Sequence, residues 1–137
     1  MTYLLDTSAC VDYMRRPDSG LRVWLSARNR ALVQLCSVVE AELWLGVRKR
    51  PTERNYRNVT EFLAAFECYP FDRAAAKVYA DIRADLERKG EVVGPNDMLI
   101  AAIAVSRGAT LVTGNAKEFR RISSLTSIPL EELAHRR

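Results

Sequence analysis

The sequence YLLDTS, at residues 3–8, joins a short apolar strand to the start of a helix and places an acid, Asp6, at the junction. Helical patterns separate further apolar stretches, which predict strands at 31–36, 68–71, 110–113 and 125–128. This alternation is typical of an α/β fold with a mostly parallel central sheet, here of four to five strands. The carboxyl ends of parallel strands meet at one edge, so we expect Asp6 to lie where such folds build their sites.

Helices are predicted from their start and stop signals as well as from apolar spacing. In the longest one, Val78, Ile82 and Leu86 recur every four residues, and Asp72 precedes it as an N-cap. Gly108 follows the most apolar helix as a C-terminal stop. The expected helices are residues 7–16, 21–29, 37–50, 53–66, 73–89, 95–107 and 116–122.

The size and composition of the chain indicate one globular domain over residues 1–137. Hydrophobic residues make up 48% and charged residues 28%, which is ordinary for a folded domain. No apolar stretch approaches the roughly 20 residues that a membrane helix needs. The first residues lead into a strand pattern rather than a signal peptide, so we expect a cytoplasmic protein with no membrane partner.

Histidine and cysteine chemistry is largely excluded. The chain has one histidine, His135, and three cysteines, Cys10, Cys36 and Cys68. This excludes Ser-His-Asp triads, Cys-His pairs and HExxH zinc helices. No C-x-x-C pair occurs, so we expect three reduced thiols in the core. Any catalysis must then use carboxylates, hydroxyls, amides and a metal ion.

The charge balance points to a phosphate-bearing partner. The formal net charge is +4, the sequence pI is about 9.2, and arginine, the better partner for phosphate, outnumbers lysine. Several acids nevertheless lie at predicted strand ends and helix starts. Carboxylates that converge repel each other unless a hard cation such as Mg²⁺ holds them. An acidic metal site within a basic rim suits chemistry on phosphodiesters.

Two aspartates, Asp6 and Asp97, lie at helix starts. Each position has a structural explanation, as an N-cap for Asp6 and as a favourable partner of the helix dipole for Asp97. Thr7 or Ser8 can cap the first helix instead, and Asn96 the later one, which would leave both carboxylates free. The helix after Asp97 is apolar nearly all round and should be buried, so an acid at its mouth indicates function.

Two glutamates in the third predicted helix are separated by geometry. Ser37 and Glu40 have the spacing of a capping box, which gives Glu40 a structural role. Glu42 is two residues further on and therefore faces another direction, close to the apolar side of the helix. Glu42 is either a flanking surface residue or a site carboxylate that needs a partner.

Polar residues also follow the strand at 110–113. Thr113 and Asn115 can orient water or a phosphate by hydrogen bonds, although Gly-Asn is also a common turn pair. Glu118 could complete an acidic cluster, or it could be a solvated helix residue between Lys117 and Arg121.

Together these segments resemble the PIN domain family, and within it the VapC-type toxins of bacterial toxin–antitoxin pairs. The resemblance covers almost the whole chain. It rests on four motifs in order, each weak alone: YLLDTS at 3–8, SVVEAELWLG at 37–46, ND at 96–97 followed by IAAIA at 100–104, and LVTGN at 111–115 with Phe119.

The resemblance implies a three-layer α/β/α fold and a metal-dependent endoribonuclease that cuts structured RNA such as tRNA. It implies Mg²⁺, with Mn²⁺ as a substitute, a homodimer, and a VapB-like antitoxin that blocks the site in a heterotetramer or larger assembly. Asp6, Asp97 and Glu42 would hold the metal or position the attacking water. The outer shell would comprise Thr113, Asn115 and Glu118.

One departure from the family pattern concerns the fourth acid. Many relatives carry an aspartate where this chain has Asn115. The amide oxygen of asparagine can still bind a metal or its water, but it brings no charge. The fourth position therefore belongs either to Asn115 or to Glu118.

Three other functions compete with this interpretation. A haloacid dehalogenase-type phosphatase needs a second aspartate two residues after the first, where this chain has Ser8. A signal-receiver domain needs a phosphorylatable aspartate at the end of a central strand, and the second and third predicted strands end without one; labelling by acetyl phosphate would test it. The third alternative is an RNA-binding module that kept the fold and lost activity.

Overall fold

A five-stranded sheet in which every strand runs parallel to its neighbours forms the centre of the molecule. The computed structural model describes residues 1–133, so His135 lies outside the described residues. Across the sheet the strands are β3 (Glu67–Tyr69), β2 (Val33–Cys36), β1 (Tyr3–Leu5), β4 (Thr110–Thr113) and β5 (Ser127–Pro129). The predicted α/β class is confirmed, and the sheet is wholly parallel.

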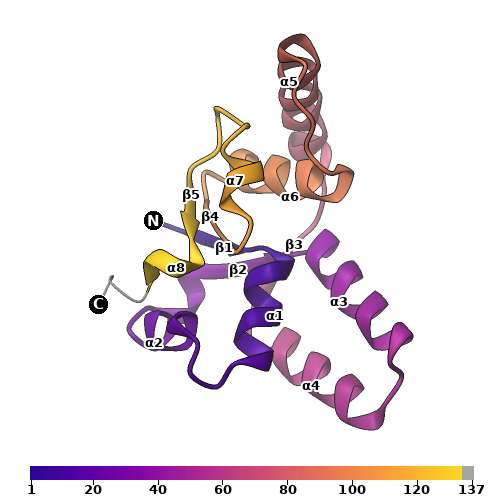
Figure 1. Ribbon diagram of the computed structural model, residues 1–137, viewed down its shortest axis with the longest axis vertical. Coiled ribbons are helices and arrows are strands. Elements are labelled where there is room, and N and C mark those ends of the chain that lie inside the picture. Colours follow the sequence, from indigo (N-terminus) through magenta and orange to yellow (C-terminus); the bar gives the residue numbers. More distant parts are fainter. Residues whose placement is uncertain (134–137) are drawn as a thin grey trace.

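Helices cover both faces of this sheet and make the three layers (Figure 1). α5 and α6 lie on one side, and α1, α2 and α4 lie on the other. The helical segments are α1 (Thr7–Arg15), α2 (Gly20–Ser26), the 3-10 turn η1 (Arg30–Leu32), α3 (Ser37–Lys49), α4 (Glu53–Ala64), α5 (Arg73–Lys89), α6 (Pro95–Ser106), α7 (Ala116–Phe119) and α8 (Leu130–Leu133).

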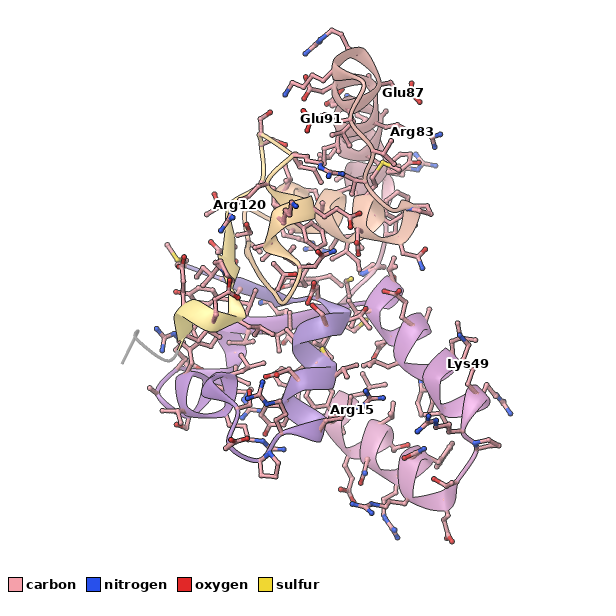
Figure 2. All side chains as sticks on the ribbon, viewed as in Figure 1. Arg15, Lys49, Arg83, Glu87, Glu91 and Arg120 are labelled. Atoms are coloured by element: carbon pink, nitrogen blue, oxygen red, sulfur yellow. The ribbon has the colours of Figure 1, made fainter. Side chains whose placement is uncertain are left out.

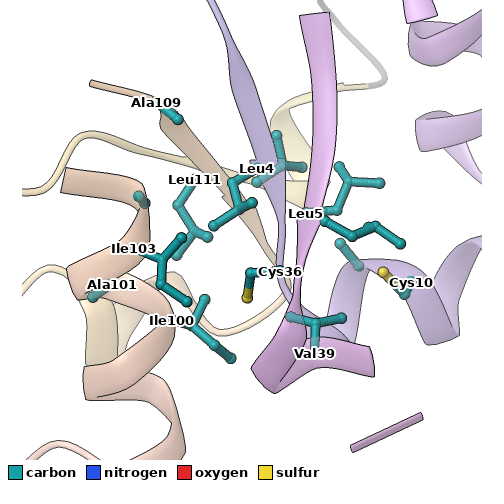
Figure 3. Close-up of a cluster of buried hydrophobic side chains, with 14 of the residues drawn as sticks. Leu4, Leu5, Cys10, Cys36, Val39, Ile100, Ala101, Ile103, Ala109 and Leu111 are labelled. Carbon is teal, nitrogen blue, oxygen red and sulfur yellow. The ribbon is translucent and has the colours of Figure 1, made fainter. Parts of the chain in front are cut away.

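The core lies between the sheet and its two helical layers (Figure 3). Successive strand residues point to opposite faces of the sheet, so the side chains of Leu4 and Leu5 in β1 pack against different helical layers. Both side chains are buried. Ile100 and Ile103 of α6 pack on one face, and Cys10 of α1 lies on the other. Strands buried on both faces explain the continuous apolar runs in the sequence.

The strand order creates a switch point at β1. The chain moves from β1 to β2 on one side and later returns to β4 on the other side, so β1 and β4 are neighbours with helices leaving in opposite directions. Parallel sheets bind ligands at the carboxyl ends of such strands. Asp6 follows β1 and Thr113 ends β4, which places both residues at this point.

Several predicted boundaries differ from the structure. The second helix ends at Ser26 rather than near Asn29, because the Asn29 side chain caps the separate turn η1 by accepting from Ala31 N. β3 starts one residue early and stops before Pro70, which has no N–H to donate. β5 starts two residues later than predicted, and α8 was not predicted at all.

The expectation of three core thiols is wrong for one of them. Cys10 and Cys36 are buried, whereas Cys68 is exposed on the edge strand β3. Partial burial of its thiol, and then the hydrogen bond that the thiol donates to the Glu40 carboxylate, raise the pKa of Cys68. Within residues 1–133 no helix has the length and hydropathy to cross a bilayer.

Candidate active site

Asp6 is the buried centre of the site. Its side chain is 3% exposed, and protein groups occupy both of its carboxylate oxygens. Oδ1 accepts from Ala9 N at 2.8 Å and from Ser8 Oγ at 2.7 Å, and Oδ2 accepts from Thr113 Oγ1 at 2.5 Å. Burial raises the pKa of Asp6, and these three hydrogen bonds oppose that rise.

The turn after β4 fixes the two hydroxyls that hold Asp6. Gly114 N donates to Ser8 Oγ at 2.9 Å, and Asn115 N donates to Thr113 Oγ1 at 2.8 Å. Each hydroxyl therefore accepts from a backbone amide and gives its own proton to Asp6. A Cβ on Gly114 would lie 3.2 Å from Ser8 Oγ, so the close approach favours glycine.

Glu42 reaches the same edge from α3. Its Oε1 accepts from Thr7 Oγ1 at 2.5 Å, and its Oε2 accepts from Asn96 Nδ2 at 3.4 Å. These contacts tie α3 to the start of α1 and to the start of α6. The carboxylate of Glu42 therefore lies at the acidic edge of the sheet, in contact with the starts of two other helices.

Asp97 and Glu118 meet around the N-terminus of α6. Glu118 Oε1 accepts from Gly94 N at 2.5 Å, and its Oε2 accepts from Asn115 Nδ2 at 2.9 Å. A Cβ on Gly94 would lie 3.3 Å from Glu118 Oε1 and 3.7 Å from Asp97 Oδ2. Glycine at this position lets the two carboxylates approach each other.

The negative charges of Asp6, Glu42 and Glu118 all act on Asp97. Burial, and then the charges of Glu118, Asp6 and Glu42, raises the pKa of Asp97 to about 6. The pKa of Glu118 is lowered, chiefly because the Gly94 N–H stabilises its charged form. A nearby cation would therefore stabilise the charged form of Asp97.

The structure thus brings together all six predicted site residues, Asp6, Glu42, Asp97, Thr113, Asn115 and Glu118. The two candidates for the fourth position are in contact, because Asn115 donates its amide N–H to Glu118. Of the two, Glu118 is the one that can carry a negative charge.

Three predicted caps are wrong. Asp6 itself caps α1, because its extended backbone directs Oδ1 to Ala9 N, and neither Thr7 nor Ser8 does. Gly94 is the N-cap of α6, which leaves Asn96 inside the first turn and free to reach Glu42.

The third wrong cap is the proposed capping box of α3. Ser37 is the first residue of this helix, so the N-cap is Cys36, which makes no side-chain cap bond. Ser37 Oγ instead accepts from Phe71 N, and Glu40 accepts from Cys68. Glu40 therefore has a structural contact, although a different one, and it stays outside the acidic cluster.

The donor set of this edge fits a hydrated divalent cation. It consists of carboxylate, hydroxyl and amide oxygens, which are the ligands of Mg²⁺ and Mn²⁺. Among residues 1–133 no three acidic, cysteine or histidine side chains are gathered closely enough to ligate one ion together. Mg²⁺ commonly takes only one or two carboxylates and keeps several waters, so the arrangement suits it.

Comparison with known proteins identifies the family. A PIN domain model matches residues 3–125. The chain belongs to the PIN domain family. Ribonuclease VapC2 of Rickettsia felis is 41% identical over 128 residues, which cover 91% of this chain and 95% of the relative. The tRNA(fMet)-specific endonuclease VapC of Shigella flexneri is 34% identical over 126 residues, with the same coverage of each chain.

Solved structures place this PIN domain in the same group. A chain of the DNA-bound VapBC structure from Salmonella typhimurium superposes with a TM-score of 0.89 at 34% identity, covering 95% of this chain and 98% of the other. A chain of Rickettsia felis VapBC2, bound to a promoter DNA fragment, gives 0.85 at 38% identity, covering 94% and 98%. The VapC branch of the family is thus the one to which the chain is similar throughout.

The geometry also bears on the receiver-domain alternative. Strands two and three end without an aspartate, but the central strand is β1, and the acid Asp6 follows it. The PIN domain match then accounts for the same acid.

Sequence reasoning missed Ser8, Gly94 and Asn96 as parts of the site. Ser8 and Asn96 were assigned to helix capping, because Ser and Asn next to a helix start usually cap it. The sequence signal for Gly94 was its position before Pro95, at the start of the helix that carries Asp97. A glycine there lets acidic side chains lie close to the backbone.

Proposed function

We propose that this PIN domain is a metal-dependent endoribonuclease and the toxin of a VapBC-type pair. The observation that carries the proposal is the gathering of Asp6, Glu42, Asp97 and Glu118 at the switch point of a parallel sheet. The likeness to proteins named ribonuclease VapC supports RNA as the substrate. Residues 1–133 contain no histidine, so proton transfer within the described cluster relies on water and carboxylates.

Asp6, Asp97 and Glu42 are the residues that would hold the metal, one or two of them directly and the rest through its bound waters. A bound Mg²⁺ or Mn²⁺ would polarise the scissile phosphate and make an adjacent water more acidic. Thr113 and Ser8 keep Asp6 in one orientation, and Thr7 and Asn96 do the same for Glu42. Groups held in this way need not reorganise when the substrate arrives.

The substrate class and partners follow from the relatives. Because the Shigella flexneri relative is named a tRNA(fMet)-specific endonuclease, we propose tRNA as the first structured RNA to test. The Salmonella and Rickettsia structures are VapBC complexes, so we propose a VapB-like antitoxin for this chain, with a homodimer of the toxin in a heterotetramer or larger assembly.

Cleavage of total cellular RNA by the purified, antitoxin-free chain tests the proposal. With Mg²⁺ we expect discrete fragments whose new 5′ ends map to a few positions, and EDTA should abolish them. Mn²⁺ added after EDTA should restore the same positions. A folded chain that binds RNA yet produces no fragments with either ion would favour the non-catalytic RNA-binding alternative.

Glu118 should act by positioning rather than by holding the metal directly. Glu118→Gln keeps an oxygen for Gly94 N, so we expect a loss of cleavage rate of only about tenfold, as for groups that orient ligands. Its lost charge lowers the pKa of Asp97, so the acidic limb of the pH–rate profile should move to lower pH. A loss as complete as that of Asp97→Asn would contradict this role.

A further inference from the structure

A groove leads away from the acidic cluster between α1, α3 and α4. Thr7 and Glu42 line it at the acidic end, and Arg15 and Arg50 line it further along. Amide side chains of Asn55 and Asn58, apolar residues and Gly46 complete the wall. The α3–α4 hairpin that forms one side extends away from the sheet (Figure 1).

The end of this hairpin concentrates positive charge. Residues 48–57, called the basic arm below, hold five basic side chains and one acidic side chain, a net charge of +4 that equals that of the whole chain. All five basic residues are exposed, as is Arg15 across the groove. Figure 2 shows Arg15 on α1 beside α4, and Lys49 towards the outer end of α3.

These cations have no counter-charge of their own. Within residues 1–133 the side chain of Arg15 and the five basic side chains of the arm make no ion pair and no hydrogen bond, in contrast to Arg83 and Arg88 on α5. Helix dipoles favour Arg15, Arg48 and Lys49 in the last turns of their helices. Arg54 lies in the first turn of α4, where the helix dipole disfavours a cation. A bound anion would offset this unfavourable interaction.

The groove also has the right length to follow a nucleic-acid strand. Glu42 and Arg50 are eight residues apart on and just after one helix, which is about 12 Å at the rise of an α-helix. A strand with one phosphate at the acidic cluster would therefore place a phosphate a short way along its chain near Arg50 and Arg15. Tyr56 of the basic arm, which lies outside the groove lining, is 59% exposed and packs at a tilt against Trp44 with 5.5 Å between ring centroids, so it offers a face for a base.

We propose that this groove and the basic arm hold the RNA strand next to the cut, with Arg15 and Arg50 binding its phosphates. The inference rests on the proposed ribonuclease function. Arginine suits the role because its planar guanidinium can donate two parallel hydrogen bonds to a phosphate. The free cations, which no acid of the described chain neutralises, match the charge of a polynucleotide better than that of an ordinary peptide.

RNA binding by a variant that lacks the charges of Arg15 and Arg50 tests this inference. Bulk cellular tRNA and a fluorescein-labelled oligouridylate are titrated in the non-cleaving Asp97→Asn background, with and without Arg15→Gln/Arg50→Gln, over a series of salt concentrations. We expect about tenfold or greater loss of affinity at low salt, and a plot of log affinity against log salt that is shallower by about 1–2 units. Arg15→Lys/Arg50→Lys should restore much of the affinity.

A matched pair of variants controls for net charge. Lys77→Gln/Arg120→Gln removes the same two charges from exposed positions on α5 and beside α7, outside the groove. Equal effects of the two pairs on RNA affinity would overturn the inference, as would a loss of antitoxin binding with RNA affinity unchanged. In the cleaving protein the groove variant should raise KM more than it lowers kcat.

The outcomes also separate this inference from the proposed function. Equal RNA cleavage by the wild type and by the Arg15→Gln/Arg50→Gln variant would rule out the inference and leave the proposed ribonuclease. A wild-type chain that binds RNA through these arginines but never cleaves it would remove the ribonuclease and leave the binding surface.

Discussion

The Asp97→Asn variant should lose RNA cleavage and gain stability. Removing a metal-holding carboxylate should lower the cleavage rate by more than about a hundredfold, because even residues that only orient a ligand cost 10–100-fold. The gain in stability follows from the pKa of Asp97, which is raised to about 6 by burial and by Glu118, Asp6 and Glu42. In the metal-free protein its charge opposes folding.

The pH dependence of this gain has a defined sign. Between about pH 4 and pH 6 the folded state retains a proton on Asp97 that the unfolded state has lost, so this group's contribution to stability falls as the pH rises. Above pH 6 the wild type carries the full penalty. After allowance for solvent screening at this half-buried site we expect about 1 kcal/mol, a few degrees in melting temperature.

Thermal melts of both proteins at pH 4 and pH 7.5, in EDTA, measure this difference. The variant should melt higher at pH 7.5 and equally at pH 4, and Mg²⁺ should raise the melting temperature of the wild type alone. Glu40→Gln is the matched control, because it neutralises an acid on α3 that contacts Cys68 outside the cluster. A variant less stable than wild type at pH 7.5 would contradict the electrostatic account.

Asp6→Ala should lose cleavage and also lose stability, the opposite of Asp97→Asn. The buried carboxylate caps α1 through Ala9 N and accepts from Ser8 and Thr113, so alanine leaves three donors without their partner. Loss of a cap and of buried acceptors costs on the order of 1–3 kcal/mol, reduced by relief of one buried charge.

Chemical denaturation at pH 7.5 measures this cost, and Asp6→Asn separates the two roles of the residue. The asparagine oxygen can keep the bond to Ala9 N, so we expect near wild-type stability without cleavage. An Asp6→Ala protein as stable as wild type would show that the hydrogen bonds to Asp6 do not support the fold.

The two substitutions have opposite effects on stability because Asp6 and Asp97 have different surroundings. Asp6 receives hydrogen bonds from a hydroxyl on each oxygen, and each hydroxyl is fixed by an amide of the β4–α7 turn. Asp97 receives little comparable support and lies among like charges. The site therefore combines Asp6, whose hydrogen bonds stabilise the fold, with Asp97, whose charge destabilises it. Such a combination is expected where function and stability conflict.

Much of the fold was predictable because its signals are local. The bounds of β4 and α5 are those expected from the sequence, since an apolar run between Gly108 and Gly114 and a four-residue spacing after Asp72 define them. The candidate residues were also found in order along the chain. Acids at strand ends and helix starts can be recognised from neighbouring residues alone, so the sequence was enough to find them.

The rest depended on contacts between distant segments. Thr113 binds Asp6 across 107 residues, and Asn96 reaches Glu42 across 54. No local pattern says that β1 lies between β2 and β4, which is what makes Ser8 and Gly114 neighbours. The wrong cap at Ser37 has the same origin, because its hydroxyl accepts from Phe71 N, 34 residues away, instead of capping α3.

A magnesium titration of single-turnover RNA cleavage, run side by side for the wild type and Asp97→Asn, tests the central claim most directly. We predict a wild-type rate that rises from the EDTA background to a plateau as Mg²⁺ increases, and a variant rate that stays near the background throughout. A wild-type rate in EDTA equal to the plateau, or a variant that reaches the wild-type plateau, would contradict a metal-dependent centre at these carboxylates.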